Sequence, residues 1–526
     1  DYTYCSKERY YFENVPEMRL KPQSGNWRSS AAKLFYAPIS GEDMASVQVV
    51  VPLLEQILAI YSGNVSLNNI IVEHSSGVPN CGNTTESRGA CDSDLAEMAD
   101  GALAIGGNAA NVKLVNLIVR DVGGYAIKAN NAPRLSIERA VFRGCGAGGA
   151  LITGSPLASV VHSSVIGFGE RYPAGVGVNM ASSPNGTVSH CDISGGLYNG
   201  IVYGGRNNDG AFQLFEYNHV HNNGHLSDEG ICDFGAIHGS NPNSTQPIYI
   251  KNNLFHSIQA FQNGGNGIYM DAGSVGLEVS GNLVYNVTGA SLIWNGGHTP
   301  GYPFPSADNS GTTVITNNVL ISDRENLYYH CMMAGGQTER NSAISWNGFT
   351  PARMEKNVVV VNATNAPSRQ AWFNGQPCAS NPKRSVEQGT AALHSIPGST
   401  ACSWDLADSF KVAVLRNNVY FNATGVETLS HSFPGSCDST SLGACSATRG
   451  GRSEYNHGCA CASWAQWLAT GNDKGSLATD PRLEGPIKLV TSAAALGLGI
   501  QPLHQLATVG PNWLPSDVKN PLATAT

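Results

Sequence analysis

A short motif recurs along this chain: an Asn, or a residue in its place, followed by three residues rich in Val, Ile, Leu or Phe. The copies are NIIV at Asn69, NLIV at Asn116, RAVF at Arg139, SVIG at Ser164, CDIS at Cys191, NHVH at Asn218, NLFH at Asn253, NLVY at Asn282, NVLI at Asn318, NVVV at Asn357 and NVYF at Asn418. Between Asn116 and Asn282, successive copies begin 23 to 35 residues apart. Such a period, with β-branched strands and no helical period between them, indicates a solenoid.

The kind of solenoid follows from what the repeat contains and lacks. The Leu framework of leucine-rich repeats is absent, so a parallel β-helix remains, in which each coil adds about 4.8 Å along the axis. Stacked Asn side chains at one turn can hydrogen-bond from coil to coil. Parallel crossovers are almost always right-handed. We therefore expect an all-β, right-handed parallel β-helix.

A second set of strands follows the motif within most coils, beginning near a glycine. These segments read GYAIKA, GGALIT, GVGVNM, NGIVYG, FGAIHG and NGIYMD. Long insertions interrupt the repeat at 73–100, 297–312, 324–350 and 366–410. Insertions of this kind usually gather on one face, where they form the walls of a binding groove.

The two ends of the chain do not carry the repeat. We expect an N-terminal segment over 1–62, with a short strand and an amphipathic helix within 46–62. The β-helix with its loop insertions is expected over 63–425. A Cys-rich loop and a small C-terminal cap, with one helix at SWAQWLATG, are expected over 426–526.

Composition narrows the class of protein. Only 13% of the residues are charged and 60 are glycines, as suits β-rich architecture with many tight turns. The net charge of −8 argues against a nucleic-acid partner. No apolar run reaches the length of a membrane span.

Glycosylation sequons and cysteines together indicate a secreted or cell-surface protein. The sequons lie at Asn64, Asn83, Asn185, Asn243, Asn286, Asn362 and Asn422, and the chain has 13 cysteines. This combination favours an oxidising secretory route and an extracellular glycoprotein.

The cysteine spacings favour disulfides over metal sites. Cys81 and Cys91 bracket one polar loop, and Cys378 and Cys402 bracket another, so we expect each pair to close its loop. Their spacing matches no common zinc pattern. Cys145 falls at a repeat position and is expected to be a small buried hydrophobic residue, as is Cys191.

Several longer motifs resemble a known family. They are RYYFENVPEM…GNW…KLFYAPISGED, CDFGAIHG, GNGIYMDAGSVGLEVSGNLVYN and SWAQWLATGNDKGSLATDPRL…LGIQPL. In order and spacing they resemble bacterial β-helix proteins related to glycoside hydrolase family 141, over essentially the whole chain. The resemblance implies glycosidase activity on polysaccharides that contain fucosyl or xylosyl units. A related β-xylosidase family shares the architecture.

Members of that family usually carry a further stretch before the EN-x-x-E segment, which supplies the first coils and a cap. The resemblance therefore implies that such a part precedes this sequence. It is either removed at a processing site or supplied as a separate chain. Cys5 has no obvious local partner, which fits an assembly partner.

Glycoside cleavage needs two carboxyl groups, one to protonate the leaving oxygen and one to act as nucleophile or to activate water. The family motifs place these at Asp233, before the GAIH strand, and at Asp271, after the GIYM strand. The reserve carboxylates are Asp228 and Glu229 in the preceding polar loop. Because Asp before Gly is also a common turn former, a purely structural role is the alternative.

Aromatic side chains near the carboxylates fit a sugar site. His238 and Tyr269 are expected to face outward from equivalent positions on adjacent coils, and Trp294 and Asn295 follow one coil later. Such rings stack on the apolar faces of sugars, although an outward aromatic ladder that stabilises the solenoid is an equal alternative. His238 stands where the family often has Tyr, and Ala272 stands where it often has an acidic residue.

Three functions remain open from the sequence. The first is a secreted glycoside hydrolase that acts on polysaccharide through the Asp pair. The second is a non-catalytic extracellular glycoprotein that binds glycans or assembles in a structural coat. The third is a polysaccharide lyase or epimerase, which Ca²⁺ bound among Asp228, Glu229 and Asp233 would favour. Otherwise we expect no cofactor and no metal site. Fold alone does not choose among them.

Overall fold

A computed structural model gives the arrangement of most of the chain. The residues that it describes are 27–30, 33–77, 96–97, 99–204, 211–224, 233–241, 247–260, 264–271, 274, 276–295, 313–322, 328–331, 336–339, 341–347, 352–361, 370–376, 413–422, 429–431, 460–462, 468, 473–485 and 488–511.

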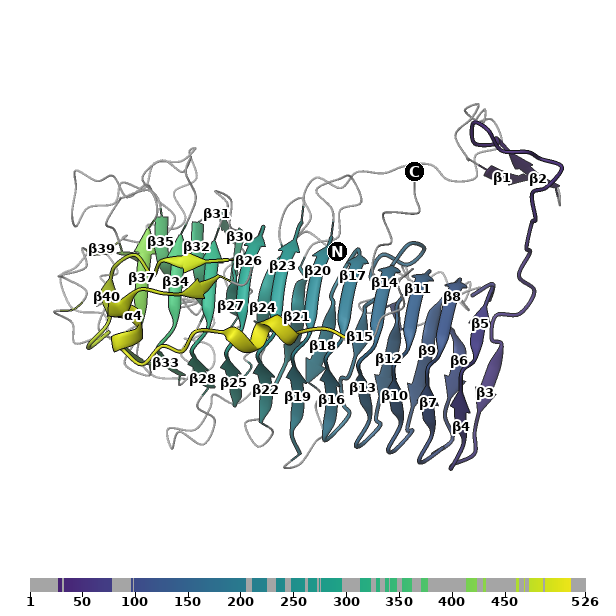
Figure 1. Cartoon of the computed structure of the whole chain (residues 1–526), viewed down its shortest axis with the longest axis horizontal. Coiled ribbons are helices and arrows are strands. Elements are labelled where there is room, and N and C mark those ends of the chain that lie inside the picture. The colour runs from purple at the N-terminus through teal and green to yellow at the C-terminus, as the bar shows by residue number, and fades with distance from the viewer. Residues whose placement is uncertain are drawn as a thin grey trace, which may run out of the picture.

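Three long parallel sheets run side by side along one elongated solenoid (Figure 1). The chain visits them in turn, so each coil contributes one strand to each sheet, and each strand pairs with the equivalent strands of the coils before and after it. This is a parallel β-helix, as the sequence predicts.

Sheet 1 contains the glycine-led strands that the sequence predicts. Its strands are β3 (Leu58–Ile60), β6 (Gly101–Ile105), β9 (Tyr125–Asn130), β12 (Ala150–Thr153), β15 (Val178–Asn179), β18 (Ile201–Gly204), β21 (Gly235–Ser240), β24 (Asn266–Asp271), β27 (Leu292–Asn295), β32 (Asn341–Asn347) and β35 (Gln370–Gln376).

Sheet 2 was not foreseen from the sequence, which predicts two strands per coil. Its strands are β4 (Ser66–Asn68), β7 (Lys113–Val115), β10 (Ser136–Glu138), β13 (Ser159–Val161), β16 (Gly186–Ser189), β19 (Gln213–Glu216), β22 (Ile248–Lys251), β25 (Leu277–Ser280), β28 (Thr313–Thr316), β33 (Ala352–Glu355) and β36 (Ala413–Arg416). Each strand has only three or four residues, often with a single fully buried side chain. An alternating apolar pattern this short cannot be recognised in the sequence.

Sheet 3 contains the strands that follow the Asn motif. They are β5 (Ile71–Glu73), β8 (Ile118–Val122), β11 (Val141–Cys145), β14 (Ser164–Phe168), β17 (Asp192–Gly196), β20 (His219–Asn223), β23 (Leu254–Ile258), β26 (Leu283–Val287), β29 (Val319–Ser322), β34 (Val358–Val361), β37 (Val419–Asn422) and β40 (Leu477–Ala478).

Short antiparallel pairs and two short helices of the described chain lie outside these sheets. The pairs are β1 (Trp27–Ser30) with β2 (Lys33–Tyr36), β30 (Tyr328–Cys331) with β31 (Gly336–Glu339), β38 (Leu429–His431) with β39 (Ala460–Ala462), and β41 (Leu483–Glu484) with β42 (Leu489–Val490). The helices are α4 (Ala493–Gly497) and the 3-10 helix η2 (His504–Thr508). Strands of the coils are thus found from β3 to β40, and the division of the chain at 62 and 425 stays a prediction.

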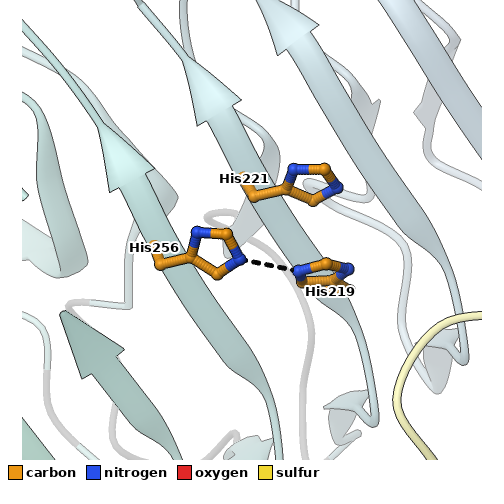
Figure 2. Close-up of side chains that lie close together, drawn as sticks. All are labelled: His219, His221 and His256. Atoms are coloured by element: carbon orange, nitrogen blue, oxygen red, sulfur yellow. Dashed lines mark hydrogen bonds between the residues drawn. The ribbon is translucent and has the colours of Figure 1, made fainter. Parts of the chain in front are cut away.

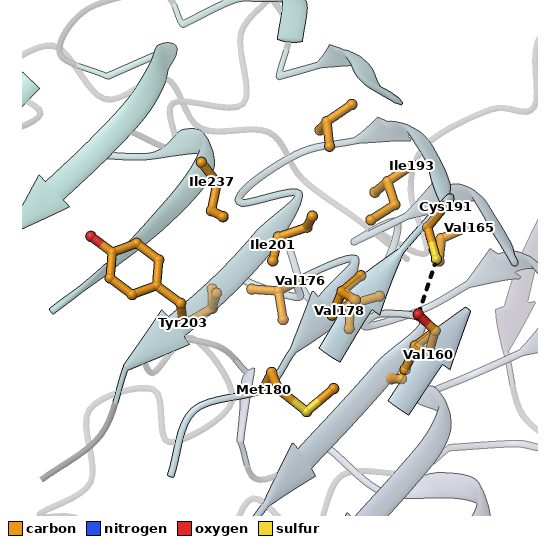
Figure 3. Close-up of a cluster of buried hydrophobic side chains, with 14 of the residues drawn as sticks. Val160, Val165, Val176, Val178, Met180, Cys191, Ile193, Ile201, Tyr203 and Ile237 are labelled. Atoms are coloured by element: carbon orange, nitrogen blue, oxygen red, sulfur yellow. Dashed lines mark hydrogen bonds between the residues drawn. The ribbon is translucent and has the colours of Figure 1, made fainter. Parts of the chain in front are cut away.

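Alternate side chains of each strand point into the solenoid and form one continuous core. Cys191 illustrates how tightly this core is packed, because its thiol donates a hydrogen bond to the carbonyl oxygen of Val160 at 3.4 Å (Figure 3). Burial raises the pKa of Cys191 to about 12. Cys145 is likewise buried and free. The prediction that both are small buried core residues is confirmed.

Buried Asn side chains form a continuous ladder at the turn between sheets 2 and 3, which confirms the role predicted for the motif. The amide Nδ2 of each Asn donates to Oδ1 of the next, at 2.9 to 3.1 Å. The members of this ladder, in order, are Asn218, Asn253, Asn282, Asn318, Asn357 and Asn418.

In the first coils, the Asn of the motif does not occupy the ladder position, which differs from the prediction. Asn69 and Asn116 have φ of 58° and 52° and occupy the left-handed turn position just before the ladder position. In the coil of Asn116 the ladder position is taken by Leu117, an apolar residue that is fully buried. Asn is favoured at both positions, but for different reasons. At the turn position it tolerates the left-handed conformation, and at the ladder position its amide hydrogen-bonds along the stack.

The amide ladder begins only at Asn218. Its Oδ1 accepts a hydrogen bond from the backbone N–H of Cys191, which holds the same place one coil earlier, at 3.0 Å. The coils before Cys191 close this turn with Ile, Leu, Ala or Ser at the equivalent position. The first half of the solenoid is therefore built without the amide stack.

The helix expected within 46–62 is absent. Residues 47–57 have no regular helix or strand, and the chain enters sheet 1 directly at β3. Pro52 explains the difference, because it lacks a backbone N–H and disfavours helix in the residue before it. The apolar side chains of Val49, Val51 and Leu53 are therefore exposed.

The C-terminal segment 488–511 runs back along the outside of the coils (yellow in Figure 1). Its apolar residues Ile500, Leu503 and Leu506 pack in one cluster with outward residues of sheet 3, such as Leu283 and Val358. This segment covers apolar positions on the side of sheet 3 that would otherwise face water. The C-terminal cap over 426–526 stays a prediction. The helix expected at SWAQWLATG falls almost wholly outside the described residues.

Several other predictions concern residues outside the described part of the chain. Cys5 and the expected disulfide partners Cys81, Cys91, Cys378 and Cys402 all fall there. So do the sequon residues Asn83, Asn243 and Asn362 and the side chain of Asn422. Asn64 is exposed, and Asn185 and Asn286 are half-buried. Disulfides, glycosylation and secretion stay predictions.

Among the described residues, no helix combines the length and the apolar character needed to cross a membrane.

Candidate active site

The predicted site residues lie on neighbouring strands of sheet 1. β21 and β24 pair in parallel, with His238 opposite Tyr269 and Ser240 opposite Asp271. Because alternate residues of a strand face opposite sides, His238, Tyr269 and Asp271 point away from the core that holds Ile268 and Met270. The two adjacent coils therefore present these side chains on the same outer face.

The rings of His238 and Tyr269 form a stacked pair on this face. Their centroids are 4.3 Å apart and their planes differ by 9°. The register thus places the two rings at equivalent positions on adjacent coils, as expected from the sequence.

Each ring of the stacked pair contacts one of the two predicted carboxylates. The hydroxyl of Tyr269 donates a hydrogen bond to Oδ1 of Asp233 at 2.9 Å. Nε2 of His238 lies 3.5 Å from Oδ2 of Asp271. The side chains of His238 and Asp271 are 13% and 18% exposed, so this pair is accessible but largely shielded from water. The structure thus gathers Asp233, His238, Tyr269 and Asp271 into one cluster.

The backbone around Asp271 is held by a hydrogen-bonded turn. The backbone N–H and the hydroxyl of Ser274 both donate to the carbonyl oxygen of Asp271, at 3.0 and 2.6 Å. The Ser274 Oγ in turn accepts from the backbone N–H of Asn241, at 2.9 Å. This arrangement ties the ends of β21 and β24 together where Asp271 leaves the strand.

Asp233 is positioned by a strained backbone and a close approach. Its φ of 65° lies in the left-handed region, which Asp tolerates better than most residues. A Cβ at Gly264 would lie 2.7 Å from the Asp233 nitrogen, so only glycine leaves room for the chain there. The approach of the two coils places the Asp233 carboxylate beside the Tyr269 hydroxyl.

Tyr269 is more buried than an outward position suggests. Only 2% of the residue is exposed, and it packs in a small cluster with Ala290 and Ile293, separate from the main core. Its ring therefore packs against the neighbouring coil, and His238 is the more accessible ring of the pair.

Trp294 does not occupy the strand position equivalent to Tyr269. Ile293 lies opposite Tyr269, whereas Trp294 lies opposite Met270, a core residue. Asn295 follows Trp294 as Asp271 follows Met270. The role of Trp294 in sugar binding stays a prediction, and the register favours Asn295 as the residue that continues the Asp271 column.

Polar residue types recur at one register position of sheet 1. Ser240 is in register with Asp271, and Asn295 is in register with Asn347, which is in register with Gln376. We call the positions of Ser240, Asp271, Asn295, Asn347 and Gln376 the polar column of sheet 1.

The reserve carboxylates Asp228 and Glu229 lie outside the described residues, as does Ala272. The direct link of each carboxylate to one ring was not foreseen from the sequence. Alternation along a strand could not supply it, because both contacts join residues of different coils and Asp233 lies outside the strands. A carboxyl separation of about 5 to 9.5 Å stays a prediction.

Comparison with known proteins supports the architecture. A family model described as "Right handed beta helix region" matches residues 101–301, in agreement with the predicted handedness. No curated protein matches the chain.

Two solved structures show a weak similarity. One, titled "Glycoside hydrolase", has 14% identity and a TM-score of 0.39, and the match covers 49% of this chain and 52% of that one. The other, "The complex structure of XylC with xylose", has 12% identity and a TM-score of 0.25, and the match covers 69% of this chain and 51% of that one. The chain thus spans about half the length of each. Similarities of this size assign no activity to it, and membership of glycoside hydrolase family 141 stays a prediction.

Proposed function

We propose that the protein is a glycoside hydrolase that acts on polysaccharide through Asp233 and Asp271. The observation that carries the proposal is the stacked pair of His238 and Tyr269, which contacts one carboxylate on each side. Asp271 ends strand β24 and Asp233 lies in the bend before β21, and two carboxyl groups in one cluster meet the basic requirement of glycoside cleavage.

The two carboxylates have different surroundings, which suits different roles. Asp233 accepts a hydrogen bond from a neutral hydroxyl, so it is assigned the ionised role, as nucleophile or as the base that activates water. Asp271 lies at a strand end beside His238, and it is assigned the proton donor to the leaving glycosidic oxygen. His238 touches Asp271 and is a positioning residue.

The substrate class follows from the family resemblance and the shape of the site. The sequence motifs resemble enzymes of fucosyl- and xylosyl-containing polysaccharides. The polar column of sheet 1 offers hydrogen-bonding residue types over successive coils, which suits a long polymer better than a small sugar.

A panel of polysaccharides that contain fucosyl or xylosyl units tests this function with the full chain. Hydrolysis releases new reducing ends without a double bond, whereas a lyase leaves an unsaturated product. Binding without any new reducing ends would identify a glycan-binding protein instead, and would overturn the proposal.

The contact between His238 and Asp271 leads to a specific prediction. We expect His238→Ala to lower kcat about 10- to 100-fold, because both the contact with Asp271 and the ring stack on Tyr269 are lost. His238→Tyr keeps a ring on Tyr269 and a donor near Asp271, so it should retain most of the activity. Steady-state kinetics of both variants provides the check, and equal loss in the two would exclude a positioning role.

A further inference from the structure

Three histidines come together on the outer face of sheet 3, away from the candidate active site (Figure 2). His219 and His221 lie on β20, and His256 lies on β23 in register with His221. Asp192, on β17, is in register with His219. Residues i and i+2 of a strand share a face, so all four side chains project outward from three adjacent coils.

The ring nitrogens are close enough to share one ion. One ring nitrogen of each histidine lies within 4.8 Å of those of the other two. Nε2 of His219 and Nε2 of His256 are 2.9 Å apart. With zinc–nitrogen bonds of about 2.0–2.1 Å, two nitrogen ligands of one ion lie about 2.9 Å apart at a right angle and about 3.4 Å apart at the tetrahedral angle. The His219–His256 pair already has this separation.

The rings already have partners of the kind found behind metal ligands. Nδ1 of His219 lies 3.0 Å from Oδ2 of Asp192, and Nδ1 of His256 lies 3.0 Å from the hydroxyl of Ser257. Nε2 of His221 lies 3.3 Å from the same Asp192 oxygen, so this carboxylate contacts two of the three rings. Nδ1 of His221 lies 2.9 Å from the amide Nδ2 of the exposed Asn222, a contact that a bound ion would replace. A proton on Nδ1 of His219 leaves the lone pair of Nε2 directed toward His256. This is the carboxylate–histidine arrangement that orients metal-binding imidazoles.

Charge also favours a cation at this place. The Asp192 carboxylate oxygen Oδ2 lies 3.0 Å from Nδ1 of His219 and 3.3 Å from Nε2 of His221, and its side chain is 19% exposed. Within the described residues, neither Lys nor Arg forms an ion pair with Asp192.

We propose that His219, His221 and His256 bind one divalent transition-metal ion such as Zn²⁺, with Asp192 orienting the imidazoles. Imidazole nitrogens suit Zn²⁺, Ni²⁺ and Cu²⁺, whereas Ca²⁺ and Mg²⁺ prefer oxygen ligands. The site is independent of the proposed hydrolase activity, because it lies on sheet 3 and the carboxylate pair lies on sheet 1. The sequence does not predict this metal site, because the residues that form it come from separate coils.

The site also adjoins Gly510 of the C-terminal segment. The backbone N–H of Gly510 donates to the carbonyl oxygen of Tyr217 at 2.9 Å, and a Cβ on Gly510 would lie 3.7 Å from the Cβ of His219. A bound ion would link the coils of β20 and β23 at the point where the C-terminal segment contacts sheet 3. Metal binding is therefore expected to raise the melting temperature.

Calorimetric titration of the chelator-treated full chain with Zn²⁺ tests the proposal. We expect one ion per chain and no competition from Ca²⁺. Asp192→Asn should weaken Zn²⁺ binding about 10- to 100-fold, as loss of an orienting partner does, and His219→Ala and His256→Ala should weaken it further.

His190→Ala is the matched control. His190 lies on a neighbouring turn, stacked on Tyr217 and in tilted contact with His162, outside the cluster, so its loss should leave Zn²⁺ binding unchanged. Absorption of Co²⁺ bound to the unaltered protein, displaced by Zn²⁺, reports nitrogen ligands even if a variant fails to fold. A chain that binds no Zn²⁺, or equal weakening in His190→Ala and His256→Ala, would overturn the proposal and leave a hydrogen-bonded histidine cluster.

Discussion

Asp271→Asn is expected to lower kcat for polysaccharide hydrolysis by about 10²- to 10⁴-fold, the usual contribution of a general acid. Asn has the shape of Asp but cannot deliver a proton to the leaving oxygen. The side chain lies at the end of β24, outside the hydrophobic core, so folding should be preserved. Initial rates on a substrate that the wild-type protein cleaves provide the measurement, with the melting temperature recorded in parallel. Asp233→Asn should cause a comparable loss.

A carboxylate on another face of the solenoid provides the control. Glu278 lies on β25 in sheet 2, with 40% of its side chain exposed and a salt bridge to Lys251 at 2.9 Å. Surface pairs of this kind contribute little to stability, and Glu278→Gln should leave both kcat and the melting temperature nearly unchanged. Full activity in Asp271→Asn would show that the pair is not the catalytic one, even if the protein is a hydrolase.

Asn282→Ala is expected to destabilise the solenoid by about 2 to 5 kcal/mol, because it leaves buried polar groups without partners. Asn282 is fully buried. Its Oδ1 accepts from both the backbone N–H and the amide Nδ2 of Asn253, each at 2.9 Å. Its own Nδ2 donates to the carbonyl oxygen of Ile250 at 2.8 Å and to Asn318 at 2.9 Å. Denaturant unfolding followed by circular dichroism measures the loss.

Asn68→Ala separates the effect of the ladder from the general effect of losing an amide. Asn68 is exposed on β4, and its side chain accepts a 3.3 Å hydrogen bond from Asn116. Its replacement should change the free energy of unfolding by less than about 0.5 kcal/mol, as is usual for surface positions. Similar losses in Asn68→Ala and Asn282→Ala would mean that the ladder adds no special stability.

Some features of this chain could be predicted because they depend on local pattern alone. The strands of sheets 1 and 3, the buried Cys145 and Cys191 and the Asn ladder from Asn218 onward all follow from which residues recur in each coil. Burial on one side of a strand imposes alternation of side chains, and that alternation is visible in a single coil. The same alternation places His238 and Tyr269 on one outer face.

Other features depended on which residues of different coils become neighbours. Trp294 falls opposite Met270 and not opposite Tyr269, and His219 meets His256 across 37 positions of sequence. Insertions of unequal length separate the coils, so a shift of one residue in register changes every such contact.

The sequence by itself determined that this chain forms a parallel β-helix with a carboxylate-bearing outer face, because the repeat leaves its apolar strands no other way to be buried. Only the tertiary structure decided that Tyr269 is buried, that a third strand completes each coil, and that Gly510 of the C-terminal segment lies beside the histidine cluster. These outcomes depend on packing between segments that lie far apart in the sequence. A local residue pattern carries no information about which of these segments come into contact.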